Sequence, residues 1–382
     1  MALRWSGGHS APVLCVDAAR APEGLLASGS EGGEVTTWTQ DGTRLAQLRL
    51  SDGADVTCAA FSPVAPGLLY AAHGETVSVL DPRSMKAPVG ELSGVGEDEI
   101  NSLSFNETGA MLALADDAGA VRVVEVQSGK VCRTLRKHSN ICSSVAFRPQ
   151  RPQSLVSAGL DMQVMLWNLQ KTRPLGIVSL QEVSVHEEPP LLKGGQMFNP
   201  PLAHCVSVAS CGNALACAAE DGLVHLMHVG SGSRLHYQGA LKGHTQGVSQ
   251  AHFIHFLSHP YWLATGGNDG LVAIWDVGQL ANPVEAKTRT AANHKKAKSR
   301  HKSKQHHDKP KAQPSTEGSE KDDDEEESGS ADPDVVKDPG PRLSFNHQDK
   351  VNWVCPASLK GQPSLLVADQ SCSLSVYSLS GL

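Results

Sequence analysis

The sequence predicts an all-β fold made of a repeated unit. The 382 residues contain 36 glycines and 22 prolines, with short runs rich in valine, leucine, alanine and cysteine between them. This texture is typical of many short strands joined by tight turns, and no long segment has the period of an amphipathic helix. In addition, one order of residues recurs along the chain, with a histidine near the start of a unit and a tryptophan about thirty residues later.

The fourth and sixth units contain the complete pattern. Their residues are His138, Ser157, Asp161 and Trp167, and His244, Thr265, Asp269 and Trp275. We expect the indole N–H of each tryptophan to donate to the hydroxyl group. The hydroxyl group should bond to the histidine, whose other nitrogen is held by the aspartate. Each buried link of such a network stabilises a fold by about 1 kcal/mol, so the two sets are predicted to be structural tetrads.

Five further units keep the register but lose part of the pattern. The first has His9, Ser28 and Trp38, with Gly32 where the aspartate is expected, and the fifth has His204 and Asp221. The positions equivalent to the tryptophan are residues 38, 80, 124, 167, 227, 275 and 377. The first three intervals are 42, 44 and 43 residues, and the last interval of 102 residues requires an insertion.

These features resemble the WD-repeat (WD40) family. The resemblance is carried by the Gly-His pairs at residues 8–9 and 243–244 and by Ile274-Trp275-Asp276. It implies a single seven-bladed β-propeller, because seven units of this kind close a ring. It also implies a non-catalytic scaffold that binds other proteins, without a cofactor or a metal ion.

Closure of the ring requires strands from both ends of the sequence. Every blade needs four strands, but the sequence stops at Leu382, just after the expected third strand of blade seven at residues 374–379. We expect residues 2–6 to supply the missing outer strand. Such an N-to-C strand clasp leaves no free sheet edge, so a monomer is expected.

Composition divides the chain into three segments. Residues 1–280 are expected to form blades one to five and the first part of blade six, and residues 342–382 the end of blade six and blade seven. Residues 281–341 are basic and then acidic and have few apolar side chains to bury, which predicts a disordered insert in blade six. The basic residues are Lys295, Lys296, Lys298, Arg300, Lys302 and Lys304. They are interpreted either as a localisation signal or as a solvated tether.

The turn after the third strand of blade two carries a candidate partner-binding motif. It resembles the W-D-x-R box by which many WD-repeat proteins dock on the damaged-DNA-binding adaptor of cullin-4 ubiquitin ligases. Asp81 and Arg83 match the box, and Leu80 departs from it, because tryptophan is usual there. The planar fork of Arg83 would meet acceptors on the adaptor, with Asp81 holding the turn. The alternative is that Asp81 only closes its own turn and Arg83 is a solvated surface residue.

Other classes of function find less support in the sequence. The Ser-His-Asp sets suggest catalysis, but their recurrence in two blades, each time ending on a tryptophan, indicates a structural network. There is no C-x-x-C pair, the formal net charge of −7 argues against nucleic acid as a partner, and no apolar run is long enough to span a membrane. Cysteines inside apolar runs predict an intracellular protein, cytoplasmic, nuclear or both.

The leading hypothesis is therefore an adaptor or substrate receptor for a cullin-4 RING ubiquitin ligase, with a substrate protein that no motif identifies. The alternative is a general nuclear or chromatin-associated scaffold that acts through the basic insert.

Overall fold

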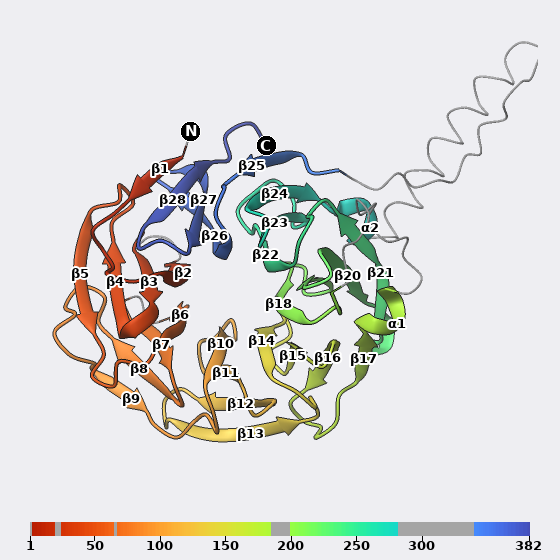
Figure 1. Cartoon of the computed structure of the whole chain (residues 1–382). Coiled ribbons are helices and arrows are strands. Elements are labelled where there is room, and N and C mark those ends of the chain that lie inside the picture. The colour runs from red at the N-terminus through yellow and green to blue at the C-terminus, as the bar shows by residue number, and fades with distance from the viewer. Residues whose placement is uncertain (1, 20–23, 65–66, 185–198, 282–339) are drawn as a thin grey trace, which may run out of the picture. The chain divides into compact units, whose positions relative to one another are not determined.

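Seven four-stranded antiparallel sheets surround a central axis in the computed structural model (Figure 1). The structure describes residues 2–19, 24–64, 67–184, 199–281 and 340–382. In six sheets the strands follow one another in chain order from the centre to the rim, because short turns join neighbouring strands. The seventh sheet is completed by a strand from the other end of the chain. The predicted seven-bladed, all-β propeller is confirmed.

The strands of the blades have the following bounds. Blade one consists of β2 (Val13–Ala18), β3 (Leu26–Ser30), β4 (Glu34–Trp38) and β5 (Arg44–Arg49). Blade two consists of β6 (Val56–Phe61), β7 (Leu69–His73), β8 (Thr76–Leu80) and β9 (Gly90–Leu92). Blade three consists of β10 (Ile100–Phe105), β11 (Met111–Asp116), β12 (Ala120–Glu125) and β13 (Lys130–Arg136). Blade four consists of β14 (Cys142–Phe147), β15 (Ser154–Gly159), β16 (Gln163–Asn168) and β17 (Gly176–Ser179).

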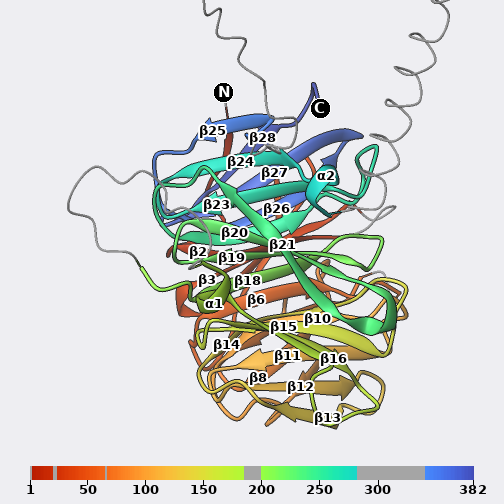
Figure 2. The same cartoon turned by 90° about the vertical axis from the view of Figure 1, so that its right-hand side faces the viewer.

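The remaining blades and the short helices complete the ring. Blade five consists of β18 (Ala203–Val208), β19 (Ala214–Ala219), β20 (Leu223–Val229) and β21 (Leu235–Lys242), whose outer strand β21 faces the viewer in Figure 2. Blade six consists of β22 (Val248–Phe253), β23 (Trp262–Gly267), β24 (Leu271–Asp276) and β25 (Leu343–Asn346). Blade seven consists of β26 (Val351–Leu359), β27 (Gln362–Asp369), β28 (Leu374–Ser378) and β1 (Leu3–Trp5). The helices are η1 (Glu31–Gly33), α1 (Leu180–Ser184), η2 (Ser231–Ser233) and α2 (Gly278–Ala281).

The N-to-C clasp is confirmed in blade seven. Strand β1 pairs antiparallel with β28, with Leu3 opposite Val376 and Trp5 opposite Leu374. Trp5 is buried and packs on Trp38 of blade one, with 6.0 Å between the ring centroids. The clasp therefore covers the edge of β28 and also joins blade seven to blade one.

The long insertion divides blade six, as the repeat intervals predict. Leu271 of β24 pairs with Asn346 of β25, although the two residues flank the insertion on opposite sides. The expected disorder of the insert and its basic residues 295–304 lie outside the described residues.

The apolar core lies between the blades. In the described part of the chain, each of seven clusters of buried side chains takes its members from two neighbouring blades. One third-strand residue of every blade belongs to the cluster shared with the preceding blade, and it lies opposite a leucine of its own second strand. These residues are Trp38, Leu80, Val124, Trp167, Met227, Trp275 and Tyr377. They are the seven positions that the sequence marks as equivalent.

Polar side chains also join the inner strands of neighbouring blades. The second residue of an inner strand donates to the carbonyl oxygen of the first residue of the next inner strand at five of the seven blade boundaries described. The donors are Thr57 to Ile100, Asn101 to Cys142, Ser143 to Ala203, Ser249 to Val351 and Asn352 to Val13. Leu14 and His204 occupy the corresponding positions at the other two boundaries. These bonds satisfy backbone groups at a sheet edge that has no strand partner.

The centre of the ring is partly filled by side chains. Trp353 of β26 packs against the clusters of three blade pairs, from blade seven to blade three. The ring of His252 lies 5.6 Å from that of Trp353, and its Nε2 lies 2.8 Å from Gln250 Oε1. Burial lowers the pKa of His252 to about 4, so this imidazole is neutral at physiological pH.

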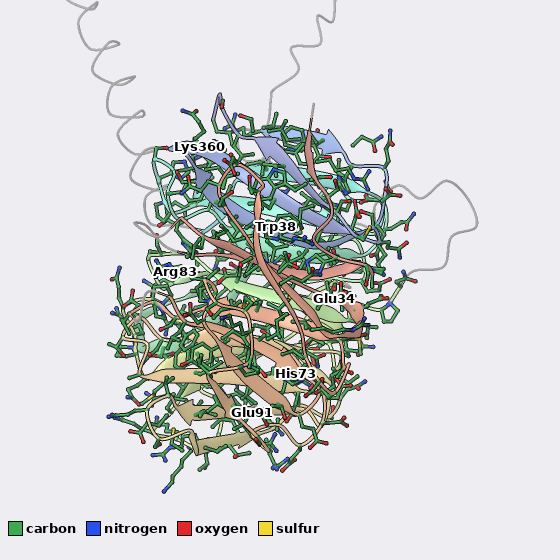
Figure 3. All side chains as sticks on the ribbon, turned by 90° about the vertical axis from the view of Figure 1, so that its left-hand side faces the viewer. Glu34, Trp38, His73, Arg83, Glu91 and Lys360 are labelled. Carbon is green, nitrogen blue, oxygen red and sulfur yellow. The ribbon has the colours of Figure 1, made fainter. Side chains whose placement is uncertain are left out.

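The turns alternate between two faces, because neighbouring strands run in opposite directions. We call one the histidine face: it holds the links between blades and the turns between second and third strands, including His9, His138 and His244. We call the other the arginine face: it holds the remaining turns, including Arg83 and Arg148. Figure 3 shows Arg83 and Lys360 on one side of the ring and Glu34 on the other.

Replacement of Ser143 by alanine should lower the free energy of unfolding by about 1 kcal/mol, because the Ala203 carbonyl oxygen loses its donor. Chemical denaturation of the full chain measures the change. The exposed Ser51→Ala variant is the control and should match the wild type. Equal stability of both variants and the wild type would show that the inter-strand bond contributes nothing.

Candidate functional site

The turn after β8 is anchored in the core at its first residue. Leu80 is fully buried in the cluster between blades one and two and pairs with Leu69 of β7. It occupies the place that Trp38, Trp167 and Trp275 take in their own blades. The departure from the W-D-x-R pattern at this position is therefore a change inside the core.

The next residues of the turn are fixed from two sides. The carboxylate of Asp81 accepts a hydrogen bond from the backbone N–H of Arg83 (3.0 Å), and the Asp81 carbonyl accepts one from Ser84 (3.0 Å). The Pro82 carbonyl accepts a bond from the hydroxyl group of Thr37 in blade one (2.9 Å). An aspartate that binds its own backbone two residues later is a common way of stabilising a turn. The backbone at Arg83 is consequently held by contacts on both sides of the turn.

The side chain of Arg83 is exposed on the arginine face. A Cβ atom at Gly67 would lie 3.5 Å from Arg83 Nη1, so the guanidinium group lies next to the turn between β6 and β7. Val64 on that turn is 57% exposed, and Val89, just before β9, is 61% exposed. Blade two therefore presents an arginine and two exposed valines at the same end. The sequence does not single out either valine, because nothing in a short apolar run tells which residues the turns leave uncovered.

Blades four and six each contain the complete tetrad. Trp167 Nε1 donates to Ser157 Oγ (2.8 Å), His138 Nε2 lies 2.7 Å from the same oxygen, and His138 Nδ1 lies 2.9 Å from Asp161 Oδ1. In blade six the equivalent distances are 3.0 Å from Trp275 to Thr265, 2.9 Å from His244 to Thr265 and 3.1 Å from His244 to Asp269. Because a carboxylate only accepts, Nδ1 carries the proton and Nε2 accepts from the hydroxyl group.

The aspartates of the two tetrads are held as carboxylates. Burial by itself would raise the pKa of Asp161, but hydrogen bonds and charge from His138 and the backbone bond from Ser139 outweigh it, and the pKa is lowered. The same balance, with His244 and Thr245, lowers the pKa of Asp269. Both carboxylates therefore stay ionised at neutral pH and close the turn that carries the histidine.

Blade one replaces the aspartate by a glutamate that the sequence analysis did not identify. His9 Nε2 lies 2.6 Å from Ser28 Oγ, which also accepts from Trp38 Nε1 (2.8 Å). Glu34 accepts from the backbone of Ser10 (2.8 Å), as the aspartates do in the complete tetrads, but it lies 3.8 Å from His9 Nδ1. Burial lowers the pKa of His9 to about 4, although the charge of Glu34 opposes the shift.

Blades five and seven use a tyrosine instead of the Ser–Trp pair. His347 Nδ1 accepts from the hydroxyl group of Tyr377 (2.7 Å), and Nε2 donates to Asp369 (2.9 Å). In blade five, His225 contacts Asp221 and Tyr237 in the same manner. His204 and Asp221 of the fifth unit have different partners. His204 lies on the inner strand β18 and bonds to Glu220 (2.8 Å), whereas Asp221 bonds to His225 of the third strand.

Blades two and three have networks of other composition. His73 bonds to Asp52 (2.5 Å) and to Ser78 (2.8 Å) without a tryptophan. In blade three the buried Arg122 forms ion pairs with Asp116 and Glu97. Every blade thus ties its turns on the histidine face through a polar network. Recurrence around the ring is what a scaffold requires, whereas catalysis needs one distinct site.

The structure brings together the members of each predicted tetrad, and it places them far from Asp81 and Arg83, on the opposite face. Among the described residues, no group of three or more His, Cys, Asp or Glu side chains is placed to hold a metal ion. Among those residues there is also no helix of the length and apolarity needed to cross a membrane. The predicted signal residues 295–304 lie outside the described residues.

Replacement of Trp167 by phenylalanine should lower the free energy of unfolding by about 2 kcal/mol, since it removes the donor to Ser157 and leaves a gap between blades three and four. Denaturant unfolding of the full chain measures the loss. The control is Trp262→Phe at a partly exposed position, where the change should be much smaller. Similar losses at both positions would contradict a special role for the tetrad.

The stability of the chain should fall by about 2 kcal/mol between pH 7 and pH 5 through His9 alone. The folded pKa of about 4 lies below the unfolded value of 6.5, so the unfolded chain binds more protons and stability decreases as the pH falls. The His9→Gln variant should show a correspondingly flatter pH dependence in unfolding experiments, whereas exposed His236→Gln should follow the wild type. If the free energy of unfolding of the His9 variant depended on pH as strongly as that of the wild type, the prediction would be contradicted.

Comparison with known proteins agrees with this architecture. Residues 69–150 match the family model described as the anaphase-promoting complex subunit 4 WD40 domain, and residues 236–276 match the model of the WD domain, G-beta repeat. The chain is 24% identical over 291 residues to the WD repeat-containing protein 53 homolog of Dictyostelium discoideum, covering 72% of this chain and 78% of that protein.

Two relatives from Arabidopsis thaliana match shorter stretches. Protein SLOW WALKER 1 is 34% identical over 116 residues, which is 30% of this chain and 21% of that protein. The transcriptional corepressor LEUNIG_HOMOLOG is 28% identical over 171 residues, which is 45% of this chain and 21% of that protein. The chain thus spans about a fifth of each of these two proteins, whereas it spans most of the Dictyostelium relative. With its seven blades, its His–Ser/Thr–Asp–Trp networks and these matches, the chain is a seven-bladed β-propeller with repeats similar to the WD40 type.

Proposed function

We propose that this chain is an adaptor or substrate receptor of a cullin-4 ubiquitin ligase, docked on the ligase's damaged-DNA-binding adaptor through Asp81 and Arg83. WD40 propellers are generally non-catalytic scaffolds for protein interactions, and the proposal names one partner for that role. The observation that carries it is the exposed Arg83 on a turn that is fixed by Asp81 and by Thr37. As a ligase subunit, the chain would work inside the cell, in the cytoplasm, the nucleus or both.

The surroundings of Arg83 support a docking role. Arginine is enriched among the residues that dominate binding energy at interfaces, because its rigid fork makes several hydrogen bonds at once. The exposed side chains of Val64 and Val89 would supply apolar area next to that fork. An anchor surrounded by apolar contacts that exclude water is the usual arrangement of such a hot spot.

The leucine at position 80 is compatible with this role. A fully buried side chain cannot touch a partner, so Leu80 acts only by seating the turn on the core. Leu80 lies opposite Leu69 of the second strand and packs in the cluster shared with the preceding blade. The tryptophans of the other blades occupy the equivalent place in their own blades. The box therefore needs a filled core position rather than an indole ring at its surface.

Replacement of Arg83 by alanine should weaken binding of the purified cullin-4 adaptor by at least about 30-fold, which corresponds to a hot-spot contribution of about 2 kcal/mol. Binding of the full chain to immobilised adaptor measures the effect. The matched control is Lys86→Ala, which removes an exposed cation from the same turn and should bind like the wild type.

Both variants should unfold at the temperature of the wild type, because neither side chain is buried. Failure of the wild-type chain to bind the adaptor would overturn the proposal. The same conclusion would follow if Lys86→Ala lost as much affinity as Arg83→Ala, since the effect would then reflect general charge. In either case a scaffold acting through residues 295–304 becomes the better account.

A further inference from the structure

A second candidate site lies on the arginine face between blades four and five. A groove of about 560 Å³ is formed there by the turns that follow β14, β16, β18 and β20. Arginine, serine, asparagine, glutamine and histidine side chains line it, and its described lining contains no aspartate or glutamate. Glu107 of blade three contacts one of these turns, where it accepts from the backbone of Gln150 (2.9 Å). The groove is thus polar and carries positive charge without acidic groups of its own.

The central residue of the groove is a buried arginine without a carboxylate partner. Arg148 is 5% exposed, and its guanidinium donates to the Gly212 carbonyl (2.7 Å), to Ser154 Oγ (3.2 Å) and to Asn213 Oδ1 (3.0 Å). All three acceptors are neutral, and no ion pair joins Arg148 to an acid in the described part of the chain. Buried charges are normally paired, so a desolvated cation of this kind leaves an unbalanced positive potential.

Two further cationic or protonatable groups share the groove with Arg148. Burial is the larger cause that lowers the pKa of Arg148, and the charge of Arg151 adds to it. Burial and the neighbouring His236 and Arg148 likewise lower the pKa of His228. The exposed guanidinium of Arg151 stands on the turn of Arg148, whose carbonyl accepts its backbone N–H (3.1 Å). Two guanidinium groups and one imidazole thus share the groove, and perturbed pKa values in a groove favour a functional site.

The backbone of the groove is also held in an uncommon conformation. Gln150 and Ser233 both line it and have positive φ angles of 60° and 58°. Residues other than glycine seldom adopt this conformation, and those that do gather at functional sites. The neighbouring Ser231 and Ser233 place two hydroxyl groups at the blade-five side of the groove.

We propose that this groove binds the phosphate group of a phosphorylated serine or threonine in a partner protein. Each terminal nitrogen of Arg148 carries two N–H groups, so the bonds described leave one donor on each for a phosphate oxygen. A phosphate dianion offers three acceptor oxygens and neutralises more of the clustered charge than a single carboxylate does. The site is independent of the docking proposed for Arg83, which lies on blade two.

The test measures fluorescence anisotropy of the full-length chain with a positional-scanning library of peptides that carry a fixed central phosphoserine. Parallel libraries carry serine or glutamate at that position. The wild type should bind the phosphoserine library at least tenfold more tightly than the other two. Equal binding of the serine library overturns the site, and equal binding of the glutamate library shows a carboxylate site and overturns the phosphate assignment.

The variants test the named residues. Arg151→Ser, at an exposed position, should lose at least tenfold in affinity for the best phosphopeptide, and Arg148→Lys should lose affinity through the missing fork. The matched control is Lys360→Ser, an exposed cation on the corresponding turn of blade seven, which should bind like the wild type. If Arg148→Lys does not fold, the phosphopeptide affinities of Arg151→Ser and His228→Gln test the site in its place. Wild-type affinity in Arg151→Ser, or an equal loss in Lys360→Ser, overturns the proposal.

A reciprocal measurement separates this proposal from the cullin-4 docking. Arg151→Ser should retain wild-type affinity for the purified cullin-4 adaptor. If it loses both the adaptor and the phosphopeptide, the groove is not a separate site.

Discussion

Packing of each blade against the preceding one is the constraint on which the rest of the structure depends. A four-stranded sheet of this size cannot bury both of its faces alone, and the seven apolar clusters accordingly lie between blades. Because every blade needs a preceding blade to pack against, blade seven must pack on blade six and must also support blade one. Strand β1 meets that need by pairing with β28 and by placing Trp5 against Trp38.

The polar networks serve the same purpose at the histidine face. In blades four and six a charged aspartate, a histidine, a hydroxyl group and an indole form one chain of bonds from the surface turn to the inter-blade core. Other blades reach the same result with Tyr377 or with the ion pair of Arg122 and Asp116. Different residues can satisfy the same requirement, because most buried donors and acceptors of the networks find a partner, although His9 Nδ1 in blade one does not.

Function is consequently left to positions that the scaffold does not use. On the arginine face the turns after the third strands share only a local bond, in which Asp81, Asn168 or Asp276 accepts from the backbone N–H two residues later. Their other side chains can therefore differ from blade to blade. Blade two exposes Arg83 beside Val64 and Val89, and blades four and five enclose Arg148 in a groove without acids. These two features occur once each in the described ring, in contrast to the repeated histidine networks. A feature that occurs once in a repeat fold is not required by the scaffold, and it is at such features that we propose binding.

The sequence alone determined the number of blades, the clasp, the seven equivalent positions and the two complete tetrads, because each repeats a local spacing that the chain must satisfy in every blade. It also placed Asp81 and Arg83 on a turn. Only the tertiary structure decided that Glu34 replaces an aspartate, that Asp221 binds His225 and not His204, and that Leu80 is wholly buried. The same holds for Val64, Val89 and the groove around Arg148. Their roles arise where separate turns or neighbouring blades meet, and residues distant in sequence leave no periodic pattern to find.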